Sequence, residues 1–349
     1  MPRVLFRVDS SLEIGTGHLM RCLTLAGALK EKNVECLFIC REHKGHSIHA
    51  IVDAGYSLFA LSSRDFLASV APTKSVSAHI HHANWLGVSQ VQDADACIAV
   101  VGDEHFDWIV VDHYALDFRW EQKLRSYCDR LLVIDDLADR SHDCDLLLDQ
   151  TYGREIADYQ KLAPAKCRFL CGTKYALLRP EFSKLREYSI NRRKLTQARS
   201  LLITMGGVDK DNITSRILHT LIEFDFPKNF QVTVVMGKSS PWTDEVRRLA
   251  KKMPCTTSVL VDIKDMAKLM AESDLAIGAA GSTAWERCCL GLPTIMLVLA
   301  LNQRFIADGL ERVGAAIVLK NTEDIESELS VHLHALILSP NGSHIMSER

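Results

Sequence analysis

The sequence predicts two similar α/β halves, each a doubly wound parallel sheet, that face each other across a cleft. Three observations lead to this fold class. Short apolar runs alternate with longer segments of helical periodicity along most of the chain. The alternation restarts near residue 200, after a charged stretch. In each half a glycine turn follows the first apolar run, at residues 15–17 and again at residues 206–207.

The first half contains four predicted strands and two predicted helices. The strands are at residues 4–8, 36–40, 108–111 and 131–134, the helices at 18–30 and 118–127, and a further apolar segment at 48–54. In the first helix, the apolar residues at 19, 22, 23, 26 and 29 share one face. Because strands and helices alternate, we expect parallel strands with ligands beyond their carboxyl ends.

The second half repeats this order. Its strands are predicted at 201–204, 231–236, 258–261, 275–278, 294–299 and 316–319, and its helices at 212–222, 243–252, 266–271 and 283–290. Charged and polar residues dominate 179–199, which predicts a boundary between a domain of residues 1–180 and a domain of residues 181–340. The chain beyond residue 340 is expected to be disordered.

The composition is that of an ordinary globular protein. Of 349 residues, 47% are hydrophobic and 24% are charged, and the net charge is −3, which excludes a disordered chain and argues against a nucleic-acid partner. Eleven cysteines without a Cys-x-x-Cys pair indicate reduced thiols rather than a zinc ribbon. Since there is no secretory leader and no membrane-spanning apolar run, we expect a cytoplasmic protein without a membrane partner.

The turn Gly15-Thr16-Gly17-His18 joins the first strand to the first helix. Its glycines let backbone N–H groups approach an anion, and the helix start favours a neutral imidazole at His18. A neutral imidazole is what a general base requires, although a capping or packing histidine fits the same position. Asp9 is a candidate to orient that ring or to bind a ligand hydroxyl, or else a turn residue. Arg21 either faces a pyrophosphate or is solvated.

Two glycine turns of the second half are candidate diphosphate sites. One is Gly206-Gly207, and the other is the run Gly-Ala-Ala-Gly-Ser-Thr at residues 278–283, between a strand and a helix. Small residues let a diphosphate reach the helix start, although no P-loop ending is present. Glu286 in the first turn can accept both ribose hydroxyls or only complement the helix dipole. The candidate binding residues of this half are Gly206, Gly207, Gly281, Ser282, Thr283, Glu286, Asn302 and Gln303.

Several clusters that resemble metal sites are discounted. The histidines at 43, 46 and 49, and those at 79, 81 and 82, lie in polar, loop-like sequence, whereas zinc needs its ligands on one helical face or on adjacent strands. Asp93 and Asp95, like Asp143 and Asp145, mimic the Asp-x-Asp of metal-dependent sugar transferases without a suitable position. No serine-hydrolase elbow occurs. We therefore expect no metal and no cofactor.

A set of ordered motifs resembles a known family. They are residues 7–23 (RVDSSLEIGTGHLMRCL), 111–114 (VDHY), 134–140 (IDDLADR), 142–150 (HDCDLLLDQ), 175–182 (YALLRPEF) and 285–293 (WERCCLGLP). With these motifs the chain resembles the UDP-2,4-diacetamido-2,4,6-trideoxy-β-L-altropyranose hydrolases of pseudaminic acid biosynthesis, which are related to spore-coat polysaccharide proteins. The resemblance covers most of residues 3–305.

The resemblance implies the GT-B-like fold of the metal-independent peptidoglycan N-acetylglucosaminyl transferases, with two Rossmann-like domains. The first holds the sugar and the second holds UDP. His18 matches the catalytic histidine of the family, and Asp112, His113 and Tyr114 line the sugar side. In the second domain, Glu286 matches the ribose-binding glutamate, Gly281, Ser282 and Thr283 the phosphate turn, and Ile263 the backbone site for uracil. Ala115 and Ala280 replace glycines of the pattern, and Leu301 replaces a polar residue.

The activity implied by the resemblance is hydrolysis of this UDP-sugar. His18 would take a proton from water, which attacks the anomeric carbon with inversion while UDP leaves. Two alternatives stay open: a glycosyltransferase with a UDP-sugar donor, and a non-catalytic nucleotide-sugar binding protein.

Overall fold

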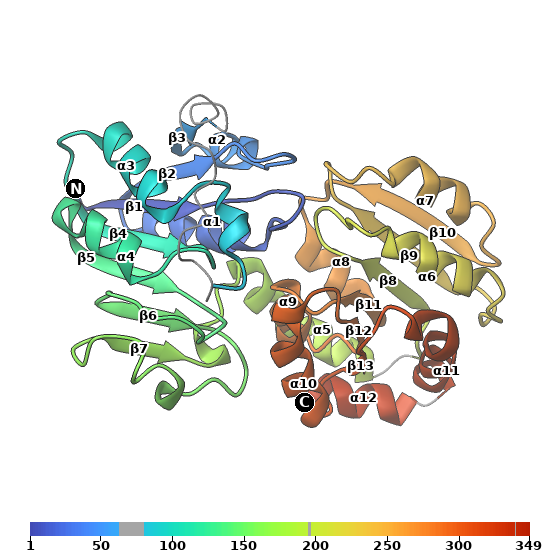
Figure 1. Cartoon of the computed structure of the whole chain (residues 1–349). Helices are drawn as coiled ribbons and strands as arrows, with labels where there is room; N and C mark the ends of the chain where they lie inside the picture. The colour runs from blue at the N-terminus through green and yellow to red at the C-terminus, as the bar shows by residue number, and fades with distance from the viewer. Residues whose placement is uncertain (63–79, 195–196, 339) are drawn as a thin grey trace. The chain divides into compact units, whose positions relative to one another are not determined.

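Seven short strands rich in apolar residues form one parallel sheet in the N-terminal half of the chain (Figure 1). The computed structural model describes residues 1–62, 80–194, 197–338 and 340–349. It divides into two compact units, Met1–Leu177 and Leu178–Arg349.

The sheet of the N-terminal unit has the strand order β3-β2-β1-β4-β5-β6-β7. Its strands are β1 (Arg3–Val8), β2 (Glu35–Arg41), β3 (Ser57–Leu61), β4 (Phe106–Asp112), β5 (Cys128–Ile134), β6 (Leu146–Asp149) and β7 (Arg168–Cys171). Alternate residues of the central strands pack on opposite faces. Val4 and Phe6 contact the helices α1 (Gly17–Lys30) and α2 (His49–Asp53). Leu5 packs with α3 (Gln90–Val101) and α4 (Phe118–Leu124).

The C-terminal unit contains a second parallel sheet, with the order β10-β9-β8-β11-β12-β13. Its strands are β8 (Ser200–Thr204), β9 (Gln231–Met236), β10 (Thr256–Val261), β11 (Leu275–Ala279), β12 (Thr294–Leu297) and β13 (Ile317–Leu319). Helices α6 (Ile213–Ile222), α7 (Thr243–Ala250) and α11 (Asp324–Leu338) pack on one face, and α5 (Pro180–Lys194) and α8 (Met266–Glu272) on the other. Helices α9 (Thr283–Cys289), α10 (Arg304–Arg312) and α12 (Pro340–Glu348) complete this unit.

These two sheets confirm the predicted fold class. In each sheet the chain order reverses beside the first strand, between β1 and β4 and between β8 and β11. The loops that follow the two neighbouring strands diverge at such a point and leave room for a ligand. In the first unit, Asp9 and the α1 turn follow β1 while Asp112 ends β4. In the second unit, residues 206–207 follow β8 and residues 280–282 follow β11.

The sequence did not predict β3, β6, β7 or α3, and two of its expectations are wrong. The tail beyond residue 340 was expected to be disordered, but it forms α12, in which the buried Ser347 Oγ donates a 2.6 Å hydrogen bond to the Gly291 carbonyl. The charged stretch at 179–199 contains α5, and its Phe182 is fully buried in the core of the C-terminal unit. Its arginine side chains bind backbone carbonyl groups at the ends of other helices of that unit.

The polar side of α5 binds the ends of two helices that come much later in the chain. Arg193 donates to the carbonyl oxygens of Met270 at 2.8 Å and Leu290 at 2.7 Å. Arg186 donates to the carbonyl of Cys289 at 2.5 Å. Burial lowers the pKa of Arg193 to about 9, although it stays charged at neutral pH. These contacts add donors to carbonyl groups at the C-terminal ends of α8 and α9, where such groups lack intrahelical partners.

Candidate functional site

The imidazole of His18 lies against a carboxylate at the end of β4. His18 is the second residue of α1, and its Nδ1 atom is 2.5 Å from Oδ1 of Asp112. Arg21 donates to both oxygens of Asp112 at 2.6 Å. Burial alone would raise the pKa of Asp112, but the charge of Arg21 and the hydrogen bonds from Arg21 and His18 outweigh burial and hold this pKa below its usual range. Asp112 is therefore an ionised carboxylate that fixes the ring of His18.

This contact sets which nitrogen of His18 is available for chemistry. With Nδ1–H donating to Asp112, the lone pair of the neutral ring is on Nε2. In the part of the chain that the structure describes, Nε2 of His18 has no hydrogen-bond partner. An oriented imidazole with a free Nε2 can accept a proton from water, as in other carboxylate-assisted histidine bases.

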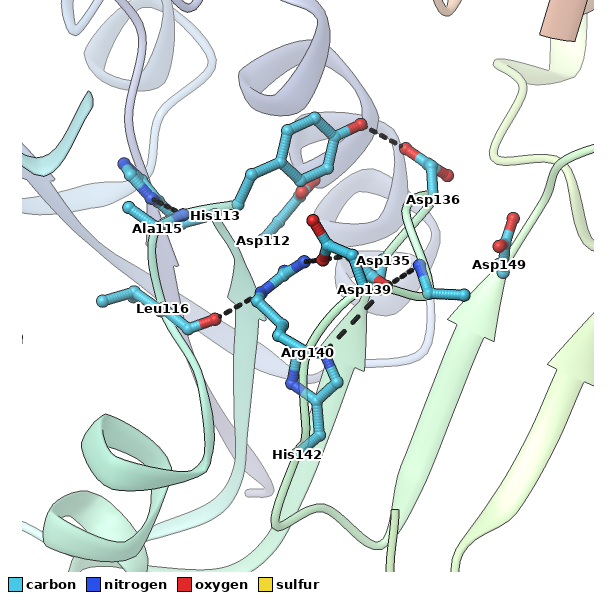
Figure 2. A network of polar contacts seen from close by, with 12 residues as sticks. Asp112, His113, Ala115, Leu116, Asp135, Asp136, Asp139, Arg140, His142 and Asp149 are labelled. Atoms are coloured by element: carbon cyan, nitrogen blue, oxygen red, sulfur yellow. Dashed lines mark hydrogen bonds and ion pairs between the residues drawn. The ribbon is translucent and has the colours of Figure 1, made fainter. Parts of the chain in front are cut away.

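Tyr114 and Asp136 complete the surroundings of His18. The Tyr114 hydroxyl donates a 2.7 Å hydrogen bond to Oδ2 of Asp136, which is the dashed line at Asp136 in Figure 2. Arg21 forms an ion pair with the same carboxylate. The Tyr114 ring packs edge-on against the imidazole, with centroids 4.4 Å apart. Burial and the nearby Asp136 raise the pKa of Tyr114, so this phenol keeps its proton. Arg21 thus binds two carboxylates and joins Asp112 to Asp136.

Asp9 and His113 lie in a second, buried network behind this constellation. Both oxygens of Asp9 accept hydrogen bonds from Arg7, at 2.5 and 2.9 Å. Nε2 of His113 lies 3.2 Å from Oδ2 of Asp9, and burial lowers the pKa of His113. Asp9 is fully buried and His113 nearly so. The structure therefore places these two residues as supports of the β1 and β4 ends. Gly17 is the first residue of α1, beside His18.

Three further residues near the site were not identified from the sequence. Asp93 binds Arg7 and Arg41 from inside α3, Asp136 binds Arg21 and Tyr114, and Trp85 packs beside His18. A signal for α3 was present in Ser89 and Gln92, which form a capping box at its start. The aspartates at 93 and 95 are helical, one buried and one exposed, which fits their exclusion as a metal motif.

The first glycine turn of the C-terminal unit is followed by a capped helix. Gly206 has a left-handed φ of 88°. A Cβ atom on Gly237 would lie 1.9 Å from the carbonyl oxygen of Gly207, so these two backbones pass in direct contact. Asp209 then accepts from the N–H groups of Ile213 and Thr214 at 2.8 and 3.0 Å. The start of α6 is therefore satisfied by the protein's own carboxylate.

The second turn, between β11 and α9, is shaped by a buried arginine. Arg287 donates to the carbonyl of Ala279 at 2.7 Å and to Oγ1 of Thr283 at 3.1 Å. Burial lowers the pKa of Arg287 to about 10. Gly281 has open space around its Cα, and Ser282 at the helix start makes no side-chain cap. The turn thus places small residues next to the buried guanidinium of Arg287.

The remaining predicted residues lie around this unit's sheet. Glu286 is on α9, 3.6 Å from Nη2 of Arg179, and burial raises its pKa. Gln303 accepts a 2.9 Å hydrogen bond from the N–H of Leu299, while the buried Oδ1 of Asn302 has no partner among the described residues. Ile263 follows β10 and packs against the α5–α8 side of the core.

The clusters considered as metal sites have other roles. Nε2 of His43 lies 3.2 Å from Asp9, and Asp143 and Asp145 pair with Arg125, while His79 lies outside the described residues. Across residues 1–62, 80–194, 197–338 and 340–349, no three His, Cys, Asp or Glu side chains are arranged to hold a metal ion. Within the same residues, no helix is both long and apolar enough to cross a membrane.

Comparisons with known proteins agree with this organisation. Residues 200–348 match the glycosyltransferase family 28 C-terminal domain. The chain is 28% identical to the UDP-2,4-diacetamido-2,4,6-trideoxy-β-L-altropyranose hydrolase of Campylobacter jejuni, over 91% of the chain and 99% of that protein. It is also 25% identical to an uncharacterized protein of Methanocaldococcus jannaschii, over 83% of the chain but only 54% of that longer protein.

The fold is shared with a solved glycosyltransferase. MurG of Acinetobacter baumannii superposes with a TM-score of 0.65 at 14% identity, covering 100% of the chain and 95% of MurG. The resemblance expected from the sequence motifs is thereby confirmed, and so is the GT-B character of the two units.

Proposed function

We propose that this protein hydrolyses UDP-2,4-diacetamido-2,4,6-trideoxy-β-L-altropyranose to UDP and 2,4-diacetamido-2,4,6-trideoxy-L-altrose. The similarity to the Campylobacter hydrolase supports an enzyme that acts on UDP-sugars. The choice of hydrolysis rests on this similarity, and the observation that carries the proposed chemistry is the His18–Asp112 contact, which leaves Nε2 of the imidazole available as a base. A base of this kind suffices to activate water for attack at an anomeric carbon.

The proposed step proceeds with inversion at C1. Nε2 of His18 takes a proton from water, and the water oxygen attacks C1 of the sugar opposite the UDP. The bond between C1 and the β-phosphate oxygen breaks, and its electron pair leaves with UDP. Asp112 stabilises the imidazolium that forms, in the manner of the aspartate of a catalytic triad. UDP is a good leaving group, so the step requires neither a paired general acid nor a metal.

The C-terminal unit is proposed to hold the UDP. The turn of Gly281, Ser282 and Thr283 would contact the diphosphate, with its N–H groups and hydroxyls as donors and Arg287 beneath. Glu286 would accept the ribose hydroxyls and the backbone at Ile263 would pair with uracil. Gly206, Gly207, Asn302 and Gln303 would make further diphosphate or sugar contacts. In the N-terminal unit, Gly17, Tyr114 and Asp112 would lie beside the sugar, with Asp9, Arg21 and His113 positioning them.

The test is UDP release from the purified protein in EDTA, followed by proton NMR. The UDP-sugar should yield UDP and free sugar, and in labelled water oxygen-18 should enter the sugar and not the UDP. His18→Asn should lower kcat by about 10²–10⁴-fold and leave UDP affinity unchanged. His105→Ala, which removes an exposed histidine of the same unit, is the matched control. Normal turnover by His18→Asn, or label in the UDP, would sink the proposal.

A glycosyltransferase is the second candidate, since the family 28 match and the MurG-like fold both occur in transferases. It differs only in that an acceptor hydroxyl replaces water. If the protein binds the UDP-sugar without releasing UDP until a sugar or lipid acceptor is added, the transferase is correct.

A further inference from the structure

Two aromatic side chains pack against the imidazole of His18, and a third packs against both of them. Tyr114 packs edge-on at 4.4 Å, and the Trp85 ring centroid is 6.4 Å from that of His18. Trp85 stacks on Tyr114 at 5.8 Å with an interplanar angle of 26°, and His82 lies 4.2 Å from Trp85. We call His82, Trp85 and Tyr114 the aromatic wall. Burial lowers the pKa of His82, so this ring is neutral at pH 7.

The aromatic wall is firmly held. Trp85 belongs to the short 3₁₀ helix η1 (Ala83–Leu86), whose last residue, Leu86, is buried in the core beside α3. Gly87 ends η1 with a left-handed φ of 74°. Tyr114 is fixed by its bond to Asp136 and by the guanidinium of Arg140, 5.9 Å from its ring centre (Figure 2). A rigid aromatic surface binds an apolar group with little loss of conformational entropy.

The base lies beside this surface. His18 is only 8% exposed, because Asp112 covers one edge of its ring and the aromatic wall covers another. Trp85 itself is half-buried and keeps an accessible part. A sugar carbon that comes within reach of water held at Nε2 therefore has to lie near Trp85. Aromatic faces favour methyl and C–H groups and offer nothing to replace the hydration of a hydroxyl.

We propose that the aromatic wall, with Trp85 at its centre, is the specificity determinant that receives the methyl groups of an N-acetylated 6-deoxy sugar beside His18. This inference rests on the proposed function and deepens it by assigning the part of the site that reads the apolar substituents. The UDP-sugar named above carries three such methyl groups, two in its acetamido groups and one at C6. The wall acts on the sugar and not on the nucleotide.

The test compares Trp85→Ala and Trp85→Phe with wild type, using the UDP-sugar for kinetics and UDP alone for binding. Trp85→Ala should raise KM by about 10–100-fold, the effect of losing methyl contacts in an apolar pocket. UDP affinity should stay within about twofold, because the wall does not touch the nucleotide. Trp85→Phe should restore most of the loss, since a smaller ring still packs against methyl groups.

A matched control separates recognition from stability. Trp242→Ala removes a half-buried tryptophan of the C-terminal unit and should lower the melting temperature without changing KM. If wild type turns over the substrate and Trp85→Ala leaves KM unchanged, the wall assignment is wrong while the hydrolase stands. If wild type releases no UDP, the proposed function fails, but titration with the intact UDP-sugar and with UDP still tests the aromatic wall. Trp85→Ala must then weaken binding of the UDP-sugar more than binding of UDP, and equal losses of affinity overturn the inference.

Discussion

Asp93 accepts two hydrogen bonds from the buried guanidinium of Arg7, at 3.0 Å from Nε and 2.7 Å from Nη2. Both side chains are fully buried, and Arg41 and Trp120 also donate to Asp93. The pair lies behind Asp9, and so it supports the end of β1.

Asp93→Ala should lower the free energy of unfolding by about 3–5 kcal/mol, because it removes one of the two buried carboxylates that bind Arg7 and the carboxylate that binds Arg41. Asp95→Ala is the matched control, since Asp95 is exposed on the same helix and pairs with Lys123. It should change stability by less than about 1 kcal/mol. Urea denaturation measures both; equal losses would refute the assigned role of Asp93.

Asp112→Asn should lower kcat by about 10²–10⁴-fold, because an amide has no charge to stabilise the imidazolium and its NH2 group would face a donor of Arg21. Binding of UDP, measured by titration, should be unaffected. Asp107→Asn alters an exposed aspartate on the same strand and should behave as wild type. An unchanged kcat for Asp112→Asn would contradict the mechanism in which Asp112 orients His18 as the base.

Gly278 in β11 and Gly281 in the turn that follows should separate folding from nucleotide binding. A Cβ on Gly278 would lie 2.5 Å from Nη1 of Arg287, so Gly278→Ala should cost about 1–3 kcal/mol of stability. Gly281 has open space, and Gly281→Ala should fold normally but bind UDP about tenfold more weakly, if the methyl group occupies phosphate space. Melting curves and UDP titration distinguish them. Full UDP affinity in Gly281→Ala would show that the diphosphate does not bind at this turn.

Asp149 should make stability depend on pH between about 4 and 7. The Tyr159 hydroxyl lies 2.8 Å from Asp149 and 2.9 Å from Asp135, yet it has one proton to donate. Burial and the nearby Asp136 raise the pKa of Asp149 to about 7, so a second proton resides on Asp149. An unfolded aspartate titrates near 4. The folded state therefore binds more protons in this window, and the free energy of unfolding falls as pH rises.

Asp149→Asn keeps a neutral group and should flatten this slope, so that its stability relative to wild type improves from pH 5 to pH 8. Asp129→Asn, at an exposed site, serves as the control. Denaturation at the two pH values gives the comparison. If the free energy of unfolding changes equally with pH in wild type and in Asp149→Asn, the proton is bound by another group.

The sequence predicted most of the fold because its signal is local. The periodicity of residues 18–30 and the run at 231–236 each record one face of one element, and both elements formed where expected. Helix α3 was missed because its two aspartates appear solvated in sequence, whereas Arg7 neutralises Asp93 from β1, 86 residues away. Helix α5 appeared to be a linker for the same reason, since its arginines bind carbonyls of distant helices.

The site was predicted in part. The glycine turn located His18, and the family motifs pointed to Asp112 and Tyr114. Their mutual geometry depends on which strands are neighbours, and no local pattern contains that information. Asp136 and Trp85 are single residues without spacing signatures, so only the packed structure reveals that they adjoin His18.

The contacts of α5 also determine the order in which the chain can fold during its synthesis. The N-terminal unit has all seven of its strands once residue 171 has emerged from the ribosome. Helix α5 is synthesised next, but Arg193 can form its hydrogen bond to the carbonyl of Leu290 only after 97 further residues have been made. Gly291 in turn receives its hydrogen bond from Ser347. The first unit can therefore fold while the second is still being synthesised, as is general for multidomain chains.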